Sequence, residues 1–243
     1  MTTTPADAVG SRATARTRRV FVPLALLAVV MALVGFWPTY FGPLLAGKAA
    51  TVLVHVHAVV FVGWLAMFVT QAALAANGRI ALHMHLGPWL FAFGMLLIVI
   101  GVATTLARFD NDLAANGLAL AARRVFGPLR DMVFFASFLA AGWICRRRPE
   151  IHKRCMLVAT TILLVAAVGR MRFLGTPPSE VWFFSVWPLP VYIAMAHDYV
   201  TKRLIHPVYV LGVLAMVAMR LVLPLRTTQP WLDFAAWLAT FYR

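Results

Sequence analysis

Charged side chains, and acidic ones above all, are scarce in this chain. Only 12% of its 243 residues are charged and only eight are Asp or Glu, whereas 62% are hydrophobic. Soluble globular domains have about a quarter of their residues charged and roughly half apolar. A chain this apolar cannot shield its surface from water. The composition therefore excludes a soluble globular domain and indicates a protein that has lipid as its solvent.

Cysteine and the usual catalytic motifs are also lacking. The two cysteines, Cys145 and Cys155, flank one short basic loop, which excludes a disulfide framework and does not match a zinc motif. The chain has no Walker loop, no glycine-rich dinucleotide turn, no HExxH sequence, no nucleophile elbow and no desaturase-type histidine boxes. None of these enzyme classes is therefore indicated.

Long apolar runs are the main feature that the chain does have. A bilayer core about 30 Å thick requires roughly 20 apolar residues per helix. On this rule the sequence predicts an all-α polytopic transmembrane helical bundle with about seven spans. The predicted spans are residues 20–38, 51–75, 88–107, 128–145, 155–174, 181–200 and 207–225. The predicted parts of the chain are a disordered tail at 1–19, one transmembrane domain at 20–225 and a short interfacial segment at 226–243.

Three local features refine this prediction. Pro188 and Pro190 predict a kinked sixth span inside the bundle, because irregular backbone at depth must be surrounded by protein or line a cavity. Segment 112–124 is predicted to form a short interfacial helix with Asp112 as its N-cap. Segment 229–242 is predicted to form a second one within the aromatic belt of the membrane.

The net charge of +14 is explained by the membrane rather than by nucleic acid. The cations lie between apolar runs, not on one face with interleaved aromatic residues. Lys and Arg beside spans retain loops in the cytoplasm and contact anionic lipid head groups. With a cytoplasmic N-terminus, twelve Lys and Arg lie on that side and nine on the other, with Arg220 inside a span. The sequence thus predicts a multi-pass protein of the bacterial inner membrane, with its N-terminus inside and its C-terminus outside.

Three connections on the predicted cytoplasmic side share one spacing. A cation precedes a histidine by four residues in segments 79–83, 148–152 and 202–206. At this spacing the two side chains lie on one face of a helix. Two interpretations follow: basic residues that snorkel to the interface, or a duplicated helical hairpin whose histidines converge on one site.

These and other segments also carry a resemblance. The residues concerned are His55-Val-His57, Gly63-Trp64, Gln71, Gly78-Arg79, Leu82-His83, Leu86-Gly87, Arg147-Arg148-Pro149-Glu150, His152-Lys153-Arg154, Met156, Gly169-Arg170 and His206-Pro207. In these residues the chain, from about residue 36 onward, resembles a group of bacterial multi-pass membrane proteins of unknown function. The resemblance implies a multi-pass membrane fold and implies no activity.

The second span contains a polar stripe. His57, Trp64 and Gln71 recur every seven residues, which keeps them on one face with about 20° of drift per heptad. His55 points about 200° away from His57, because each residue turns the helix by about 100°. We therefore expect His57 to face the bundle interior and His55 to face a neighbouring helix or the interface. His57 is interpreted as a buried polar contact, a haem or metal ligand, or a proton-relay or substrate contact.

Ionisable residues also fall near the predicted outer face. Such residues within a span are costly and usually face the interior. Arg220 is expected to be desolvated and paired with Asp131, and Arg170 lies near them in the predicted topology. Cations outnumber acids on this side, which leaves room for an anionic ligand, although the same cations can reach lipid phosphates.

Three functions fit these patterns. The first is a redox protein that holds haem b or a metal ion through the cytoplasmic-side histidines His83, His85, His152 and His197, with His83 and His152 as the principal ligands. The second is a carrier for a small anionic or proton-coupled solute. The third is a non-catalytic accessory or assembly protein of the membrane. Enzymatic activity, substrate and oligomeric state are left open by the sequence.

Overall fold

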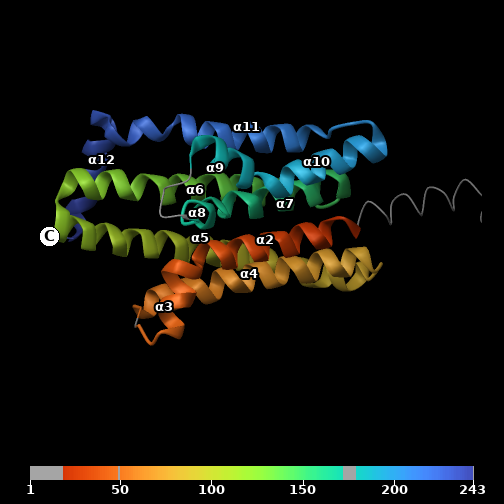
Figure 1. Ribbon diagram of the computed structural model, residues 1–243, viewed down its shortest axis with the longest axis horizontal. Coiled ribbons are helices and arrows are strands. Elements are labelled where there is room, and N and C mark those ends of the chain that lie inside the picture. The colour runs from red at the N-terminus through yellow and green to blue at the C-terminus, as the bar shows by residue number, and fades with distance from the viewer. Residues whose placement is uncertain (1–18, 49, 172–178, 243) are drawn as a thin grey trace, which may run out of the picture.

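The computed structural model describes residues 19–48, 50–171 and 179–242 of the chain, which form a helical bundle (Figure 1). Most of the predicted tail therefore lies outside the described residues. The main helices are α2 (Phe21–Phe36), α4 (Val52–Ala76), α5 (Ile80–Asn116), α6 (Leu118–Ile144), α7 (Pro149–Leu163), α10 (Leu189–Lys202) and α11 (Pro207–Leu221). Shorter elements are η1 (Trp37–Phe41), α3 (Gly42–Leu45), α8 (Val165–Val168), α9 (Glu180–Val186), η3 (Leu223–Thr227), α12 (Gln229–Ala239) and η4 (Thr240–Tyr242).

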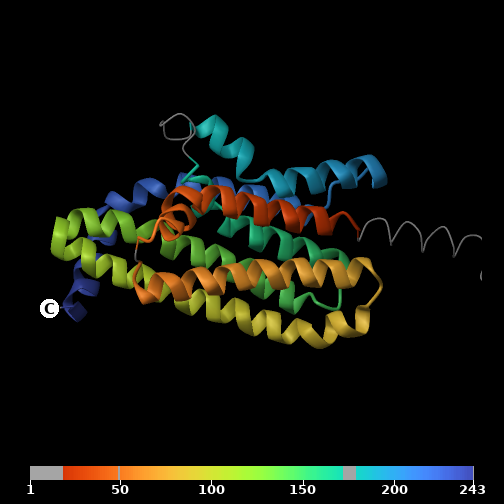
Figure 2. The same cartoon turned by 60° about the horizontal axis from the view of Figure 1, so that its bottom comes forward.

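The helices run back and forth between two ends of the bundle (Figures 1 and 2). One end, which we call the basic end, carries the connections 77–79, 145–148 and 203–206 together with the start of α2. The other end, which we call the pocket end, carries the α3–α4, α5–α6 and α11–α12 connections. This alternation is the arrangement that the apolar runs of the sequence predict.

Six helical stretches in the described part of the chain are long and apolar enough to cross a membrane. They are Phe21–Leu45, Val52–Ala76, Ile80–Asn116, Leu118–Ile144, Pro149–Val168 and Pro207–Thr227. Large apolar side chains such as Val59, Val99 and Leu214 point outward from them and are more than half exposed, as expected of surfaces that contact lipid. The chain is thus an all-α, multi-pass membrane protein, as predicted.

The predicted sixth span is formed by two short helices, α9 and α10, which meet at Trp187 and Pro188. Proline has no backbone N–H and its ring clashes with the preceding turn, so it interrupts a helix. Trp187 is fully buried at this break and donates a hydrogen bond from Nε1 to the carbonyl oxygen of Thr161, at 2.8 Å. The break therefore lies against α7 inside the bundle, as the two prolines of this span predict.

The hairpin of α5 and α6 is longer than the predicted spans. With 37 residues α5 has a length of about 55 Å, so its end projects beyond a bilayer core of about 30 Å. The predicted interfacial helix at 112–124 is wrong: α5 and α6 run through this segment and turn at Gly117, whose φ of 77° suits glycine. Asp112 accordingly lies inside α5 and caps no helix.

The C-terminal helix α12 packs against this projecting hairpin. A small apolar core joins them, which consists of Phe109, Ala121, Ala122, Val125, Ala235 and Ala239. Trp231 also donates a hydrogen bond from Nε1 to the carbonyl oxygen of Ala122, at 2.8 Å. Trp237 and Phe241 remain more than half exposed on α12 and η4. The protein face of α12 is thus occupied by the hairpin, and its exposed aromatic face is free to meet the membrane interface.

Candidate anion-binding cavity

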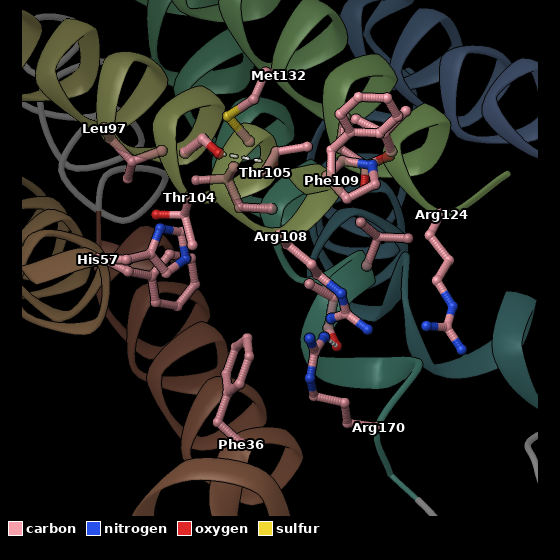
Figure 3. A pocket seen from close by; sticks show the side chains of 18 of the residues that line it. Phe36, His57, Leu97, Thr104, Thr105, Arg108, Phe109, Arg124, Met132 and Arg170 are labelled. Atoms are coloured by element: carbon pink, nitrogen blue, oxygen red, sulfur yellow. Dashed lines mark hydrogen bonds between the residues drawn. The ribbon is translucent and has the colours of Figure 1, made fainter. Parts of the chain in front are cut away.

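A cavity of about 190 Å³ opens at the pocket end of the bundle (Figure 3). Its lining residues come from α2, α4, α5, α6, α7, α8 and the residues that follow α8. The charged or titratable ones are His57, Arg108, Asp112, Arg124, Asp131 and Arg170. This is the largest gathering of the sequence-predicted interior polar residues in one place, and we treat it as the candidate site.

The stripe on α4 brings His57 to the cavity. Trp64 is fully buried and Gln71 is 6% exposed, so the face that the seven-residue spacing predicts is the one that packs into the bundle. His57, nearer the pocket end on the same face, points into the cavity beside Thr104 (Figure 3). His55 points elsewhere and lies 3.0 Å through Nδ1 from the hydroxyl of Tyr40 in η1. The two histidines thus point to different places, His57 to the cavity and His55 to the neighbouring η1.

Arg170 and Arg108 face one another across the cavity (Figure 3). Arg170 follows α8 and donates a hydrogen bond from Nη1 to the carbonyl oxygen of Ala166, at 2.6 Å. Its guanidinium carbon lies 5.0 Å from the ring centre of Phe36. Among the residues that the structure describes, no carboxylate forms an ion pair with Arg170. Two like charges thus converge on one cavity, and Arg170 lacks a carboxylate counter-ion from the described part of the chain.

The two acidic residues of the lining are paired with arginines other than Arg170. Asp112 Oδ1 lies 2.5 Å from Arg124 Nη1, and its Oδ2 lies 3.6 Å from Arg108 Nε. Asp131 Oδ1 lies 2.6 Å from Nη2 of Arg130, which does not line the cavity. The carboxylates therefore do not cancel the positive charge that Arg170 brings.

The polar groups of α5 follow a gradient along the cavity. The lining residues run from Leu97 through Thr104 and Thr105 to Arg108 and Asp112, from the middle of α5 toward the pocket end. Both threonine hydroxyls donate to carbonyl oxygens of their own helix, at 2.7 Å. Their hydrogen atoms are thus used within α5. The donors left for a ligand are the guanidinium groups and, depending on its tautomer, His57.

Arg220 does not take part in this cavity. Its guanidinium pairs with Glu180 of α9, with Nε 3.2 Å from Oε2, and lies over the ring of Phe183 at 4.9 Å. The side chains of Arg220 and Glu180 are 28% and 64% exposed. The predicted pairing of Arg220 with Asp131 is therefore wrong. Glu180 lies 40 residues away in sequence and reaches Arg220 only because α9 folds against α11.

The basic end brings two of the four predicted haem or metal ligands together. The rings of His83 and His152 lie 6.2 Å apart between centres. Each ring directs Nδ1 to a carbonyl oxygen of the preceding helix, at 3.3 Å for His83 with Gln71 and 2.8 Å for His152 with Gly142. A carbonyl oxygen only accepts, so the proton is assigned to Nδ1 in both rings. In both the α4–α5 and the α6–α7 hairpin, a histidine of the second helix thus bonds to a carbonyl oxygen of the first.

The third connection with the shared spacing differs. His206 is the N-cap of α11 and accepts a hydrogen bond at Nδ1 from the backbone N–H of Val208, at 3.3 Å. The duplicated-hairpin hypothesis therefore fits segments 79–83 and 148–152 and fails for segment 202–206.

His85 and His197 do not join the His83–His152 pair. His85 is exposed on α5, and His197 lies beside Asp198 of α10, 3.8 Å from its Oδ1. Within 19–48, 50–171 and 179–242, no three His, Cys, Asp or Glu side chains are grouped to hold a metal ion. The expected convergence of three or four ligands at the basic end is therefore not met.

One buried charge cluster escaped the sequence analysis. Arg154 of α7 is 1% exposed and forms an ion pair with Asp198 of α10, whose side chain is 3% exposed. Arg154 also lies 2.7 Å from Glu150 Oε2, and Lys202 lies 3.0 Å from the same oxygen. Arg154 comes at the edge of a predicted span, a position that by itself indicates a cation of the adjoining loop. The four-residue spacing between Glu150 and Arg154 is the sequence feature that indicates a helix at Arg154.

Comparisons with known proteins add no further identification: no family model, no curated protein and no solved structure matches this chain.

Proposed function

We propose that this multi-pass membrane protein is a carrier for a small anionic solute, with the cavity at the pocket end as its binding site. The observation that carries the proposal is the convergence of Arg108 and Arg170 on one cavity while Arg170 has no carboxylate partner among the described residues. An anion between the two guanidinium groups relieves their mutual repulsion and accepts charge-assisted hydrogen bonds from both.

The surroundings support an anion over a cation or a neutral solute. Asp112 and Asp131 are already paired with arginines, and the three arginines of the lining outnumber these two carboxylates, so the charge of the cavity favours an anion over a cation. The cavity is also smaller than the 300–1,000 Å³ typical of sites for drug-sized ligands. A small anion satisfies both the charge and the size.

The helix break supports a carrier rather than a static binding protein. Transporters place solutes near the membrane interior beside interrupted helices. Here α7 is followed by the separate short helix α8, which leads directly to Arg170 in the lining, and the break at Pro188 packs against α7 without lining the cavity. The Lys and Arg bias supports an N-terminus in the cytoplasm of a bacterial inner membrane, which places the cavity on the outer side.

The proposal is tested by anion binding to the purified full-length protein in nanodiscs, with sodium chloride, phosphate, acetate and benzoate as probes. Arg170→Gln should weaken binding about 10- to 100-fold, because a hydrogen bond to a charged group contributes about 1.5–3 kcal/mol. Arg123→Gln is the matched control, since Arg123 is exposed on α6 and does not line the cavity. Equal effects of the two variants would contradict the site. Uptake of the bound anion by proteoliposomes tests transport.

A haem- or metal-binding redox protein remains the second candidate because His83 and His152, from two different helices, meet at one depth. Metal-bound histidines commonly donate their other N–H to a backbone carbonyl, as both rings do here. The absorption spectrum and metal content of protein from haem- and iron-supplied cells test this function. A Soret band or stoichiometric metal that is lost in a His83→Ala, His152→Ala double variant and kept in His57→Ala supports it. Colourless, metal-free protein removes it.

A further inference from the structure

The inner part of the cavity is apolar. The lining residues farthest from Arg108 on α5 and from Arg170 on the α7–α8 segment are Leu97 and Leu163, and Phe36, Phe61 and Met132 add to the same lining. On both segments the sequence changes from apolar to cationic toward the pocket end, over about 17 Å from Leu97 to Arg108. The cavity is therefore amphiphilic, with an apolar inner part and a cationic outer part.

A hydrated inorganic ion does not suit such a cavity. The ion would sit at the arginines and leave to water an inner part whose walls at Leu97, Phe61 and Leu163 offer no polar partner. A carboxylate has two oxygens and matches the planar guanidinium group.

We propose that the solute is an organic carboxylate with an apolar body of about six carbon atoms, whose carboxylate lies between Arg108 and Arg170 and whose body lies against Leu97, Phe61 and Leu163. This inference rests on the proposed function and specifies its substrate class. The size follows from the volume: the cavity measures about 190 Å³, and a dry apolar cavity of about 150 Å³ in another protein binds benzene.

The chain-length dependence of binding tests the inference without any variant. Acetate, propanoate, butanoate, pentanoate and hexanoate are titrated against the full chain in nanodiscs, with empty nanodiscs subtracted. Each added methylene should tighten binding about fourfold, which is about 0.8 kcal/mol per buried CH₂ converted at 1.4 kcal/mol per tenfold. The gain should stop at about six or seven carbons, when the inner part is full, and benzoate should bind about as tightly as hexanoate.

A longer series separates a water-soluble acid from a membrane lipid. Octanoate and dodecanoate should bind no more tightly than hexanoate if the inner part is closed. A steady gain up to dodecanoate would overturn the inference, because it would mean that an acyl chain leaves the cavity between the helices. Leu97→Ala enlarges the inner part and should move the optimum one or two carbons longer, with correct folding checked by thermal unfolding.

The outcomes distinguish this inference from the proposed function. If phosphate or chloride binds more tightly than hexanoate and this binding is lost in Arg170→Gln, the carboxylate inference is overturned and the anion-binding site is kept. Absence of binding by every probe, phosphate included, overturns both. A fourfold gain in affinity per methylene, seen in the unchanged protein and in Arg123→Gln, supports both when Arg170→Gln binds the acid of every chain length more weakly.

Discussion

Replacing Asp198 with Asn should destabilise the protein by about 3 kcal/mol, because removal of one partner of a buried ion pair leaves the other charge uncompensated. The side chains of Arg154 and Asp198 are 1% and 3% exposed, so water cannot replace the lost carboxylate. The expected cost lies at the lower end of the usual range of about 3–5 kcal/mol. The reason is that Arg154 Nη1 still donates to Glu150 in the variant. It lies 2.7 Å from the carboxylate oxygen Oε2 and 2.5 Å from the backbone carbonyl oxygen of Glu150.

The assay is thermal unfolding of the purified protein in one detergent. For a chain of this length, 1 kcal/mol corresponds to about 2–4 °C, so Asp198→Asn should lower Tm by about 6–12 °C. Glu180→Gln is the matched control, since it breaks the more exposed pair with Arg220. Pairs of that kind contribute about 0–1 kcal/mol. The sequence predicts a large loss of stability when the pairing of Arg220 is broken, whereas in the structure the buried pair of this kind is Arg154 with Asp198.

A double variant separates the charge from the packing. Arg154→Leu with Asp198→Leu removes both charges, and a buried ion pair replaced by apolar groups is often neutral or stabilising. The double variant should therefore unfold at a higher temperature than Asp198→Asn. Equal and small shifts for Asp198→Asn and Glu180→Gln would refute the reasoning, because they would show that Arg154 finds water or lipid phosphate in place of Asp198.

Three further predictions concern packing, pH and topology. Gly35→Ala should lower Tm strongly, because a Cβ at Gly35 would clash with the backbone oxygen of Ala167 in α8. Gly87→Ala is the control: its Cβ meets no atom within 4 Å, so Tm should stay unchanged or rise. Burial, and after it the nearby charge of Arg154, lowers the pKa of His206 from 6.5. The folded state therefore favours the neutral ring, and the free energy of unfolding should fall as the pH drops below 6.5. His206→Asn, which keeps a capping oxygen and does not titrate, should flatten that part of the pH profile in thermal unfolding. Reporter fusions after Arg148 and after Arg243 should report cytoplasm and periplasm, and both on one side would remove a span.

The sequence determines the membrane architecture because each span must meet a local requirement. A helix satisfies its backbone hydrogen bonds within itself, so about 20 apolar residues specify a crossing without reference to any other segment. The same locality explains why the face of His57, the direction of His55 and the break at Pro188 follow from helical geometry and proline chemistry alone. The end of α5 was less predictable, because its projecting part is stabilised by α12, more than 100 residues later.

Tertiary structure decides which charges meet. Arg108 lies in α5 and Arg170 follows α8, and no spacing in the chain relates them. Arg154 and Asp198 are 44 residues apart, and Arg220 finds Glu180 rather than Asp131 only through the fold of α9 against α11. Periodicity gives the direction of a side chain about its own helix axis, whereas ion pairing depends on the depth and rotation of two helices relative to each other. That relation is set by packing over the whole bundle.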